Sequence, residues 1–202
     1  EDDLDKKINE KTAGLVITHL YSSRENILNF HRKYYGKVKI IEDVAINFGA
    51  KIDQGKLLGT IFDYGFYSFG VMKNLCTFHG GAIFSRDKIK LNEIEKNLNN
   101  DNNYPLFLSF KLLFFCMLIN IFYSRYIFNY LTYYILKLNL KKIDKLIYPG
   151  VYPKSNNQIP KHYHYKYQKN FAIAGIENLK ILKSKINNRI ENVKLYEIYL
   201  NR

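Results

Sequence analysis

Apolar and polar positions in the first part of the chain alternate between strand-like and helix-like periods. The mostly apolar run Gly14–Leu20 predicts a buried strand, Arg24–Tyr35 predicts an amphipathic helix capped by Ser22 or Ser23, and Lys37–Ile41 predicts the next strand. A strand, a helix and a strand joined by short loops make a βαβ unit with parallel strands. This pattern predicts an α/β fold.

The pattern continues with shorter elements separated by glycines. A short polar helix is expected at Asp2–Asn9, strands at Gly65–Phe69 and Ala82–Ser85, and a helix at Asp87–Asn97. Near the end of the chain, Gln168–Leu200 has a helical period. The apolar positions expected on the buried side of that helix are Ala172, Ile176, Leu179, Leu182 and Ile186.

The stretch Leu106–Leu136 differs from the rest, because Leu, Phe, Ile and Tyr dominate it and Lys111 and Arg125 are its only charged residues. Its charge-free runs are shorter than the roughly 20 residues that cross a bilayer. Two alternatives stay open. The segment contacts a membrane interface, or it forms short helices that pack against other parts of the protein or a second subunit. We therefore expect three regions, at residues 1–100, 101–140 and 141–202.

Charge and cysteine content exclude some classes of function. The formal charge is +13, and residues 137–202 hold 14 Lys or Arg against 4 Asp or Glu. A basic region favours anionic partners, but no nucleic-acid-binding motif is recognisable. Two cysteines make no disulfide framework, which favours the cytoplasm. The pair His162 and His164 has no third ligand nearby in the sequence, so no metal site is expected.

Three side chains suggest a cofactor site. Asp43 ends a predicted parallel strand, and ligands of α/β sheets bind beyond the carboxyl ends of strands. Ser68 and Lys73 follow in a glycine-containing, mostly apolar loop, before the turn Gly80-Gly81. Desolvation in such a loop lowers the pKa of an amine, which favours Schiff-base formation by Lys73.

These residues stand in a longer series of motifs. The series comprises Ile41-Glu-Asp-Val-Ala45, Gly49-Ala50, Leu58-Gly-Thr60, Tyr67-Ser-Phe69, Lys73-Asn-Leu75 and Gly80-Gly-Ala-Ile83. In order and spacing it resembles the DegT/DnrJ/EryC1/StrS family of pyridoxal-phosphate (PLP) aminotransferases of nucleotide-linked sugars. The resemblance covers residues 1 to about 87 and returns more weakly in the late helix. It implies part of the large domain of a fold-type I PLP transferase, followed by a mostly helical C-terminal region.

The resemblance also implies roles for single residues. Lys73 matches the lysine that holds PLP as a Schiff base and moves a proton during transfer. Asp43 matches the carboxylate that pairs with the pyridine nitrogen, which keeps the ring an electron sink. Ser68 matches the hydroxyl that binds the cofactor phosphate. An amino-acid donor, a nucleotide-sugar acceptor, a role in surface polysaccharide or related amino-sugar synthesis, and a homodimer follow from the same resemblance.

The sequence also departs from the family pattern. Ile46 stands where the family usually has Gln or His near the ring hydroxyl of PLP, and Asn47 replaces a usual small residue. The N-terminal part of the family is absent, so we expect this piece to be weak or inactive by itself.

Two alternatives come with these departures. A PLP sugar dehydratase typically has His at the lysine position, so Lys73 argues against that activity. A degenerate, membrane-associated scaffold without catalytic activity, at the inner face of the membrane, is the other alternative.

Overall fold

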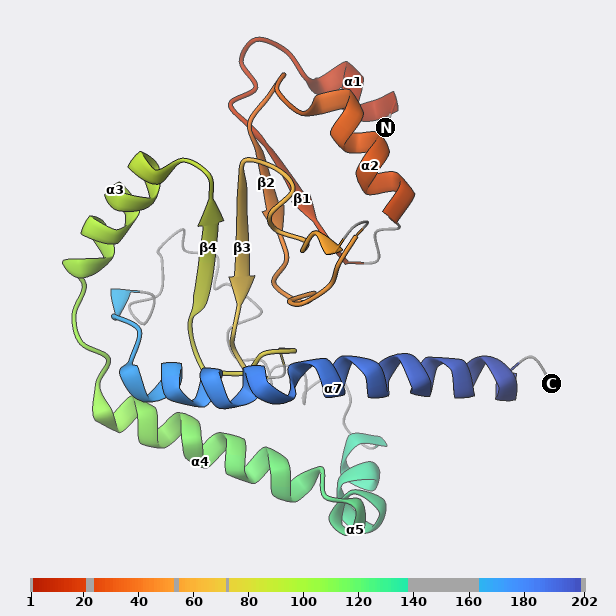
Figure 1. Cartoon of the computed structure of the whole chain (residues 1–202). Coiled ribbons are helices and arrows are strands. Elements are labelled where there is room, and N and C mark those ends of the chain that lie inside the picture. Colours follow the sequence, from red (N-terminus) through yellow and green to blue (C-terminus); the bar gives the residue numbers. More distant parts are fainter. Residues whose placement is uncertain (1, 21–23, 53–54, 72, 138–163, 201–202) are drawn as a thin grey trace. The chain divides into compact units, whose positions relative to one another are not determined.

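The computed structural model describes residues 2–20, 24–52, 55–71, 73–137 and 164–200 (Figure 1). Contacts divide the chain into two units, residues 1–100 with 167–202 and residues 101–166. The late helix is thus grouped with the first hundred residues, which the sequence pattern had separated from it. Whether the three expected regions act as separate domains stays a prediction. The predicted caps Ser22 and Ser23 and the residue His162 lie outside the described residues.

The first unit is built on a four-stranded sheet with the order β1-β2-β3-β4. Its strands are β1 (Leu15–Thr18), β2 (Ile40–Asp43), β3 (Tyr64–Ser68) and β4 (Gly81–Ser85). The first three are parallel and β4 is antiparallel to β3, as the arrows in Figure 1 show. The α/β fold predicted from the sequence is confirmed. The second strand begins three residues later than expected and includes Asp43.

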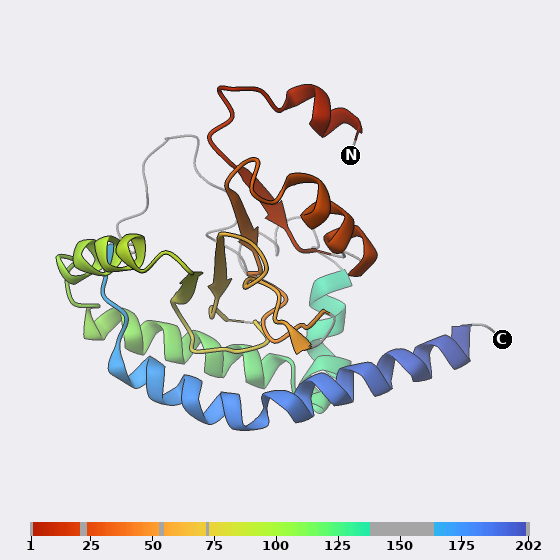
Figure 2. The ribbon, with the colours of Figure 1, turned by 45° about the horizontal axis from the view of Figure 1, so that its top comes forward.

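Three helices flank this sheet along the chain: α1 (Asp2–Lys7), α2 (Arg24–Tyr34) and α3 (Lys88–Asn99). Asp87 caps α3, because its carboxylate accepts hydrogen bonds from the backbone N–H groups of Ile89 and Lys90. Figures 1 and 2 show α2 beside β1 and β2. Together with the chain between β2 and β3, this helix buries one face of the sheet. The buried core there consists of Ile27, Tyr34, Ile40, Val44, Leu58, Ile61 and Phe62.

The opposite face of the sheet is open in the part of the chain that the structure describes. Val16, Phe66 and Ile83 belong to it and are all exposed. The strand register explains this grouping, because Asp43 pairs with Phe66 and Phe66 pairs with Ile83. Side chains alternate along a strand, so Asp43 lies on the open face and its neighbour Glu42 on the buried one.

The long helix α7 (Lys169–Leu200) packs on two loops of the first unit. The predicted buried side of this helix was partly wrong, since Ile176 is 56% exposed and Leu179 is 47% exposed. Instead, the helix faces the loop with Gly175, which packs closely on the Thr77 side chain. Its buried positions are Phe171 and Gly175, and Leu182 and Ile186 approach Gly49.

In the second unit, the apolar stretch forms α4 (Leu106–Phe122), the short α5 (Arg125–Ile127) and a π-helical turn, η2 (Phe128–Thr132). Among the described residues, no single helix is long and apolar enough to cross a membrane. Only together are the segments Leu106–Phe122 and Arg125–Lys137 long and apolar enough to cross one, and the two are bent by 62° relative to each other.

Substitution of Gly65 tests the close approach between β3 and the loop that precedes it. A Cβ atom on Gly65 would lie 2.0 Å from the carbonyl oxygen of Gly59, so Gly65→Ala should lower the free energy of unfolding by about 3 kcal/mol. Gly36 is the matched control, because it has φ +81° but nothing within 4 Å of a built Cβ. Gly36→Ala should cost only about 1 kcal/mol, from backbone strain. Equal losses in urea unfolding would contradict the close approach.

Candidate active site

Polar side chains lie at the carboxyl ends of β2 and β3. Asp43 ends β2 opposite Phe66, and Ser68 ends β3 two residues further on. Because residues two apart on a strand share a face, Asp43 and Ser68 lie on the same open face of neighbouring strands. One oxygen of Asp43 accepts a hydrogen bond from the Ala45 N–H at 3.0 Å. Within the described chain the second oxygen and the Ser68 hydroxyl have no hydrogen-bonding partner.

Lys73 lies on the loop that joins β3 to β4. The loop is closed at its base by backbone hydrogen bonds from Phe69 N to Gly80 O, at 2.9 Å, and from Thr77 N to Phe69 O, at 2.8 Å. A turn then brings the Lys73 N–H to the Gly70 carbonyl at 3.2 Å. The Lys73 side chain is half-buried and has no ion pair or hydrogen bond within the described residues. Lys73 therefore follows Ser68 by five positions along a short, anchored loop.

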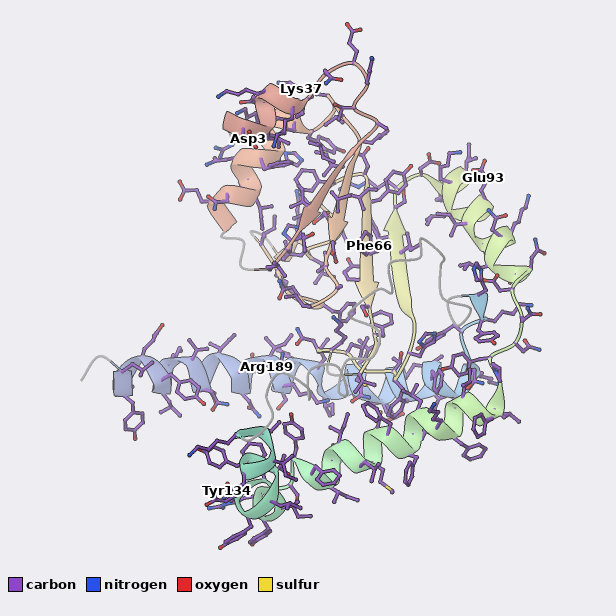
Figure 3. All side chains as sticks on the ribbon, turned by 180° about the vertical axis from the view of Figure 1, so that it is seen from behind. Asp3, Lys37, Phe66, Glu93, Tyr134 and Arg189 are labelled. Atoms are coloured by element: carbon purple, nitrogen blue, oxygen red, sulfur yellow. The ribbon has the colours of Figure 1, made fainter. Side chains whose placement is uncertain are left out.

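The helix α7 holds the same loop from the other side. The Asn178 amide donates to the Cys76 carbonyl at 3.0 Å, and Arg189 donates to the Asn74 side-chain oxygen. Figure 3 labels Arg189 on α7. Asn74 in turn donates to the Phe48 carbonyl at 3.2 Å. The residue next to Lys73 is thus tied both to α7 and to the loop that follows Asp43.

The structure adds a residue that the sequence interpretation did not single out, Glu42. Its side chain is fully buried, at 0% exposure. One carboxylate oxygen accepts the backbone N–H groups of Ile61 at 2.8 Å and Phe62 at 3.0 Å, and the other accepts Gly59 N–H at 2.7 Å. A buried carboxylate needs such partners, since its desolvation is otherwise costly. Glu42 therefore fixes the chain that leads into β3.

The fourth partner of Glu42 is the ring of His19, whose Nε2 lies 3.1 Å from the carboxylate. His19 follows β1 and is also 0% exposed, and within the described chain its Nδ1 has no hydrogen-bonding partner. A bare ring nitrogen loses less on burial than an N–H without an acceptor, so the geometry favours the tautomer in which Nε2–H donates to Glu42. The Asn47 amide donates to the carbonyl oxygens of His19 and Leu20.

These contacts determine the acidity of Glu42. Burial by itself would raise the pKa of this carboxyl group, but the hydrogen bonds from His19 and from the three backbone N–H groups outweigh burial and hold the pKa below its ordinary value. A signal for this site was present in the sequence. The alternation Ile40, Glu42, Val44 places the carboxylate on the same face as two core residues, which predicts a paired buried charge.

Two other residues named in the sequence analysis, Ile46 and His164, lie at exposed positions. Ile46 is 40% exposed, just after Asp43, and makes no hydrogen bond through its side chain. His164 is exposed. Among the described residues, no group of three or more His, Cys, Asp or Glu is arranged to hold a metal ion.

Comparisons with known proteins agree with this architecture. Over almost the whole chain, the fold matches the GDP-4-keto-6-deoxymannose-3-dehydratase ColD (TM-score 0.55, 18% identity, 96% of this chain and 42% of that one). It also matches the sugar aminotransferase CalS13 from Micromonospora echinospora (TM-score 0.54, 19% identity, 98% of this chain and 44% of that one). At these identities the likeness concerns the fold alone. The fold is that of the fold-type I PLP transferases.

The sequence narrows this class further. A model of the DegT/DnrJ/EryC1/StrS aminotransferase family matches residues 1–102, and the chain belongs to that family. GDP-perosamine synthase from Escherichia coli O157:H7 is 34% identical over 89 residues, which are 43% of this chain and 24% of that protein. The chain therefore spans about a quarter of the length of this relative and less than half of the two solved structures.

The lowered pKa of Glu42 makes the stability of the folded protein depend on pH. Its pKa in the folded protein lies below the ordinary value of 4.5, so its contribution to stability is present above pH 4.5 and is lost as the pH falls through the folded pKa. Glu42→Gln should lower the free energy of unfolding by about 2 kcal/mol near pH 7, because a Gln amide cannot accept all four hydrogen bonds. Urea unfolding at several pH values should show this difference shrinking below pH 4.5. A difference that stays constant down to pH 2 would contradict the assignment.

Proposed function

We propose that the protein transfers an amino group from an amino acid to a keto sugar linked to a nucleoside diphosphate, with PLP as its cofactor. The observation that carries the proposal is the shared position of Asp43 and Ser68 on one open face, with Lys73 on the anchored loop that follows β3. Family membership supports the reaction type. The relative named GDP-perosamine synthase supports a nucleotide-linked sugar as the substrate class.

The residues present fit the cofactor in their chemistry. A half-buried amine, a strand-end carboxylate and a strand-end hydroxyl each keep hydrogen-bonding capacity that no described residue uses. Lys73 would hold the cofactor through Nζ, Asp43 would accept the ring N–H, and Ser68 would donate to the phosphate. When bound, PLP supplies an electron sink for the negative charge that develops on the substrate carbon.

The chain's own side chains then have defined tasks. Once free, the Lys73 amine serves as the base and acid that moves a proton at the substrate carbon. The Asp43 carboxylate keeps its partner N–H protonated, because an adjacent negative charge favours the cationic form. Ile46 offers no hydrogen bond at its position after Asp43, so orientation of the cofactor ring depends on the other residues. We further propose a cytoplasmic homodimer that acts in surface polysaccharide or related amino-sugar synthesis.

Reduction with borohydride tests the central role of Lys73. The natural full-length protein, supplied with PLP and reduced, should carry a pyridoxyl group on the Lys73 peptide in mass mapping. Lys73→Ala should lose the label, whereas the matched variant Lys51→Ala, which removes an exposed lysine of the same unit, should keep it. A folded protein that carries no adduct on Lys73 would overturn the proposed function.

A second proposal concerns the apolar segment 106–136, for which we infer contact with an anionic membrane surface. Leu106, Phe107, Phe110, Phe114 and Met117 recur at helical spacing on α4, and all are exposed. Side chains project from α4 along its length in Figure 3, and Tyr134 marks the tyrosine-rich turns that follow. Residues 106–137 contain three Lys or Arg and no Asp or Glu. An apolar stripe with cations and interfacial tyrosines is typical of helices that lie in the headgroup region.

Vesicle sedimentation tests this contact. The protein should bind vesicles that contain phosphatidylglycerol more tightly than pure phosphatidylcholine, because cations add attraction to anionic lipid. The double variant Phe110→Asp/Phe114→Asp should weaken binding roughly tenfold or more, since two aromatic side chains that would insert into the lipid are lost. Val193→Asp, at an exposed apolar position on α7, is the control. Unchanged vesicle binding together with loss of a dimer would instead assign α4 to a subunit interface.

A further inference from the structure

His19 forms hydrogen bonds with two consecutive residues of β2. Its ring contacts the Glu42 carboxylate at 3.1 Å, and its backbone N–H donates to the Asp43 carbonyl at 3.0 Å. The Asn47 amide donates to the His19 carbonyl from the chain beyond Asp43. His19 is therefore held by groups on both sides of Asp43 in the sequence.

Glu42 extends the same connection to β3. Its carboxylate accepts the N–H groups of Gly59, Ile61 and Phe62, and Phe62 comes two residues before β3 begins. On the other side of Asp43, the Val44 N–H donates to the Phe66 carbonyl at 3.0 Å. The carboxyl end of β2 is thus tied to β1 through His19 and to β3 through Glu42 and Val44.

We propose that Glu42 and His19 form a buried positioning pair that fixes the main chain of Asp43 and thereby sets the place of its carboxylate on the open face. The pair lies on the buried face, so it acts on the cofactor only through Asp43. This inference rests on the proposed function, because it assigns to Asp43 the cofactor's ring nitrogen.

The choice of residues supports a positioning role over simple packing. Burying an ion pair or a charged hydrogen bond is often no better for stability than an apolar core of the same volume. Here the charge stands next to the strand-end carboxylate, and its four hydrogen bonds come from His19 after β1 and from Gly59, Ile61 and Phe62 before β3. Backbone groups are thereby held at fixed points, which apolar contacts, having no direction, do not achieve.

The test measures cofactor binding by the natural full-length protein. PLP is titrated into cofactor-free protein, and the dissociation constant and the position of the cofactor's absorbance band are recorded. Glu42→Gln should weaken binding roughly tenfold or more and shift the band, as loss of hydrogen bonds to a buried charged group allows Asp43 to move. Circular dichroism shows that the variant is folded.

Asp63→Asn is the matched control. Asp63 also accepts a backbone N–H, that of Ile40 at 3.0 Å, and an ammonium, that of Lys39 at 2.9 Å. It lies at the amino ends of β2 and β3, away from Asp43, so its neutral variant should lose stability but keep the dissociation constant and the band. If Glu42→Gln behaves like Asp63→Asn, the positioning role is wrong.

If Glu42→Gln does not fold, two variants of His19 test the same inference. His19→Gln retains an N–H donor for Glu42 and should keep cofactor binding within about threefold, whereas His19→Leu should weaken it roughly tenfold. Equal binding by the two would overturn the inference. If the unaltered protein itself binds no PLP at Lys73, the proposed function fails first, and that outcome is distinct from both.

Discussion

The arrangement at the carboxyl ends of the strands depends on one buried charge. Glu42 has lost its hydration completely, and a carboxylate in such surroundings is stable only when donors replace the water. The chain supplies them from β1, through His19, and from the residues before β3. Separate segments must therefore come together at one point before this charge is tolerated, which makes their relative positions a condition of folding.

The loop that satisfies Glu42 also requires glycine at two positions. Gly59 donates its N–H to the carboxylate, and its carbonyl passes directly over Gly65 of β3. Any side chain on Gly65 would push the loop away from the sheet and its donors away from Glu42. The Tyr67 hydroxyl fastens the same loop by donating to the Leu58 carbonyl at 2.9 Å. The close backbone packing is confined to the buried face, and Asp43 and Ser68 lie on the opposite, open face.

Sequence patterns predicted much of this fold for specific reasons. The helix Arg24–Tyr34 and the late helix were located closely because their periodicity is long and regular. Asp43 and Ser68 were placed at strand ends by local pattern and family resemblance. The motif Ile41-Glu-Asp-Val-Ala45 gave no separate role to Glu42, although alternation along the strand sends Glu42 and Asp43 to opposite faces. The partners of His19 depend on contacts between segments far apart in the sequence, which no local pattern contains.

The late helix shows why periodicity alone misplaced a buried face. Ile176 and Leu179 are strongly apolar, yet the helix turns Gly175 and Asn178 inward, because contact with the Lys73 loop requires a small residue against Thr77 and a donor for the Cys76 carbonyl. The family match covers residues 1–102, whereas Asn178 of α7, which anchors the Lys73 loop, lies 102 residues beyond its partner Cys76. The position of Lys73 is therefore a property of two distant segments. Substitutions along α7 act on the candidate site through backbone geometry, without any side chain of the helix having to reach a ligand.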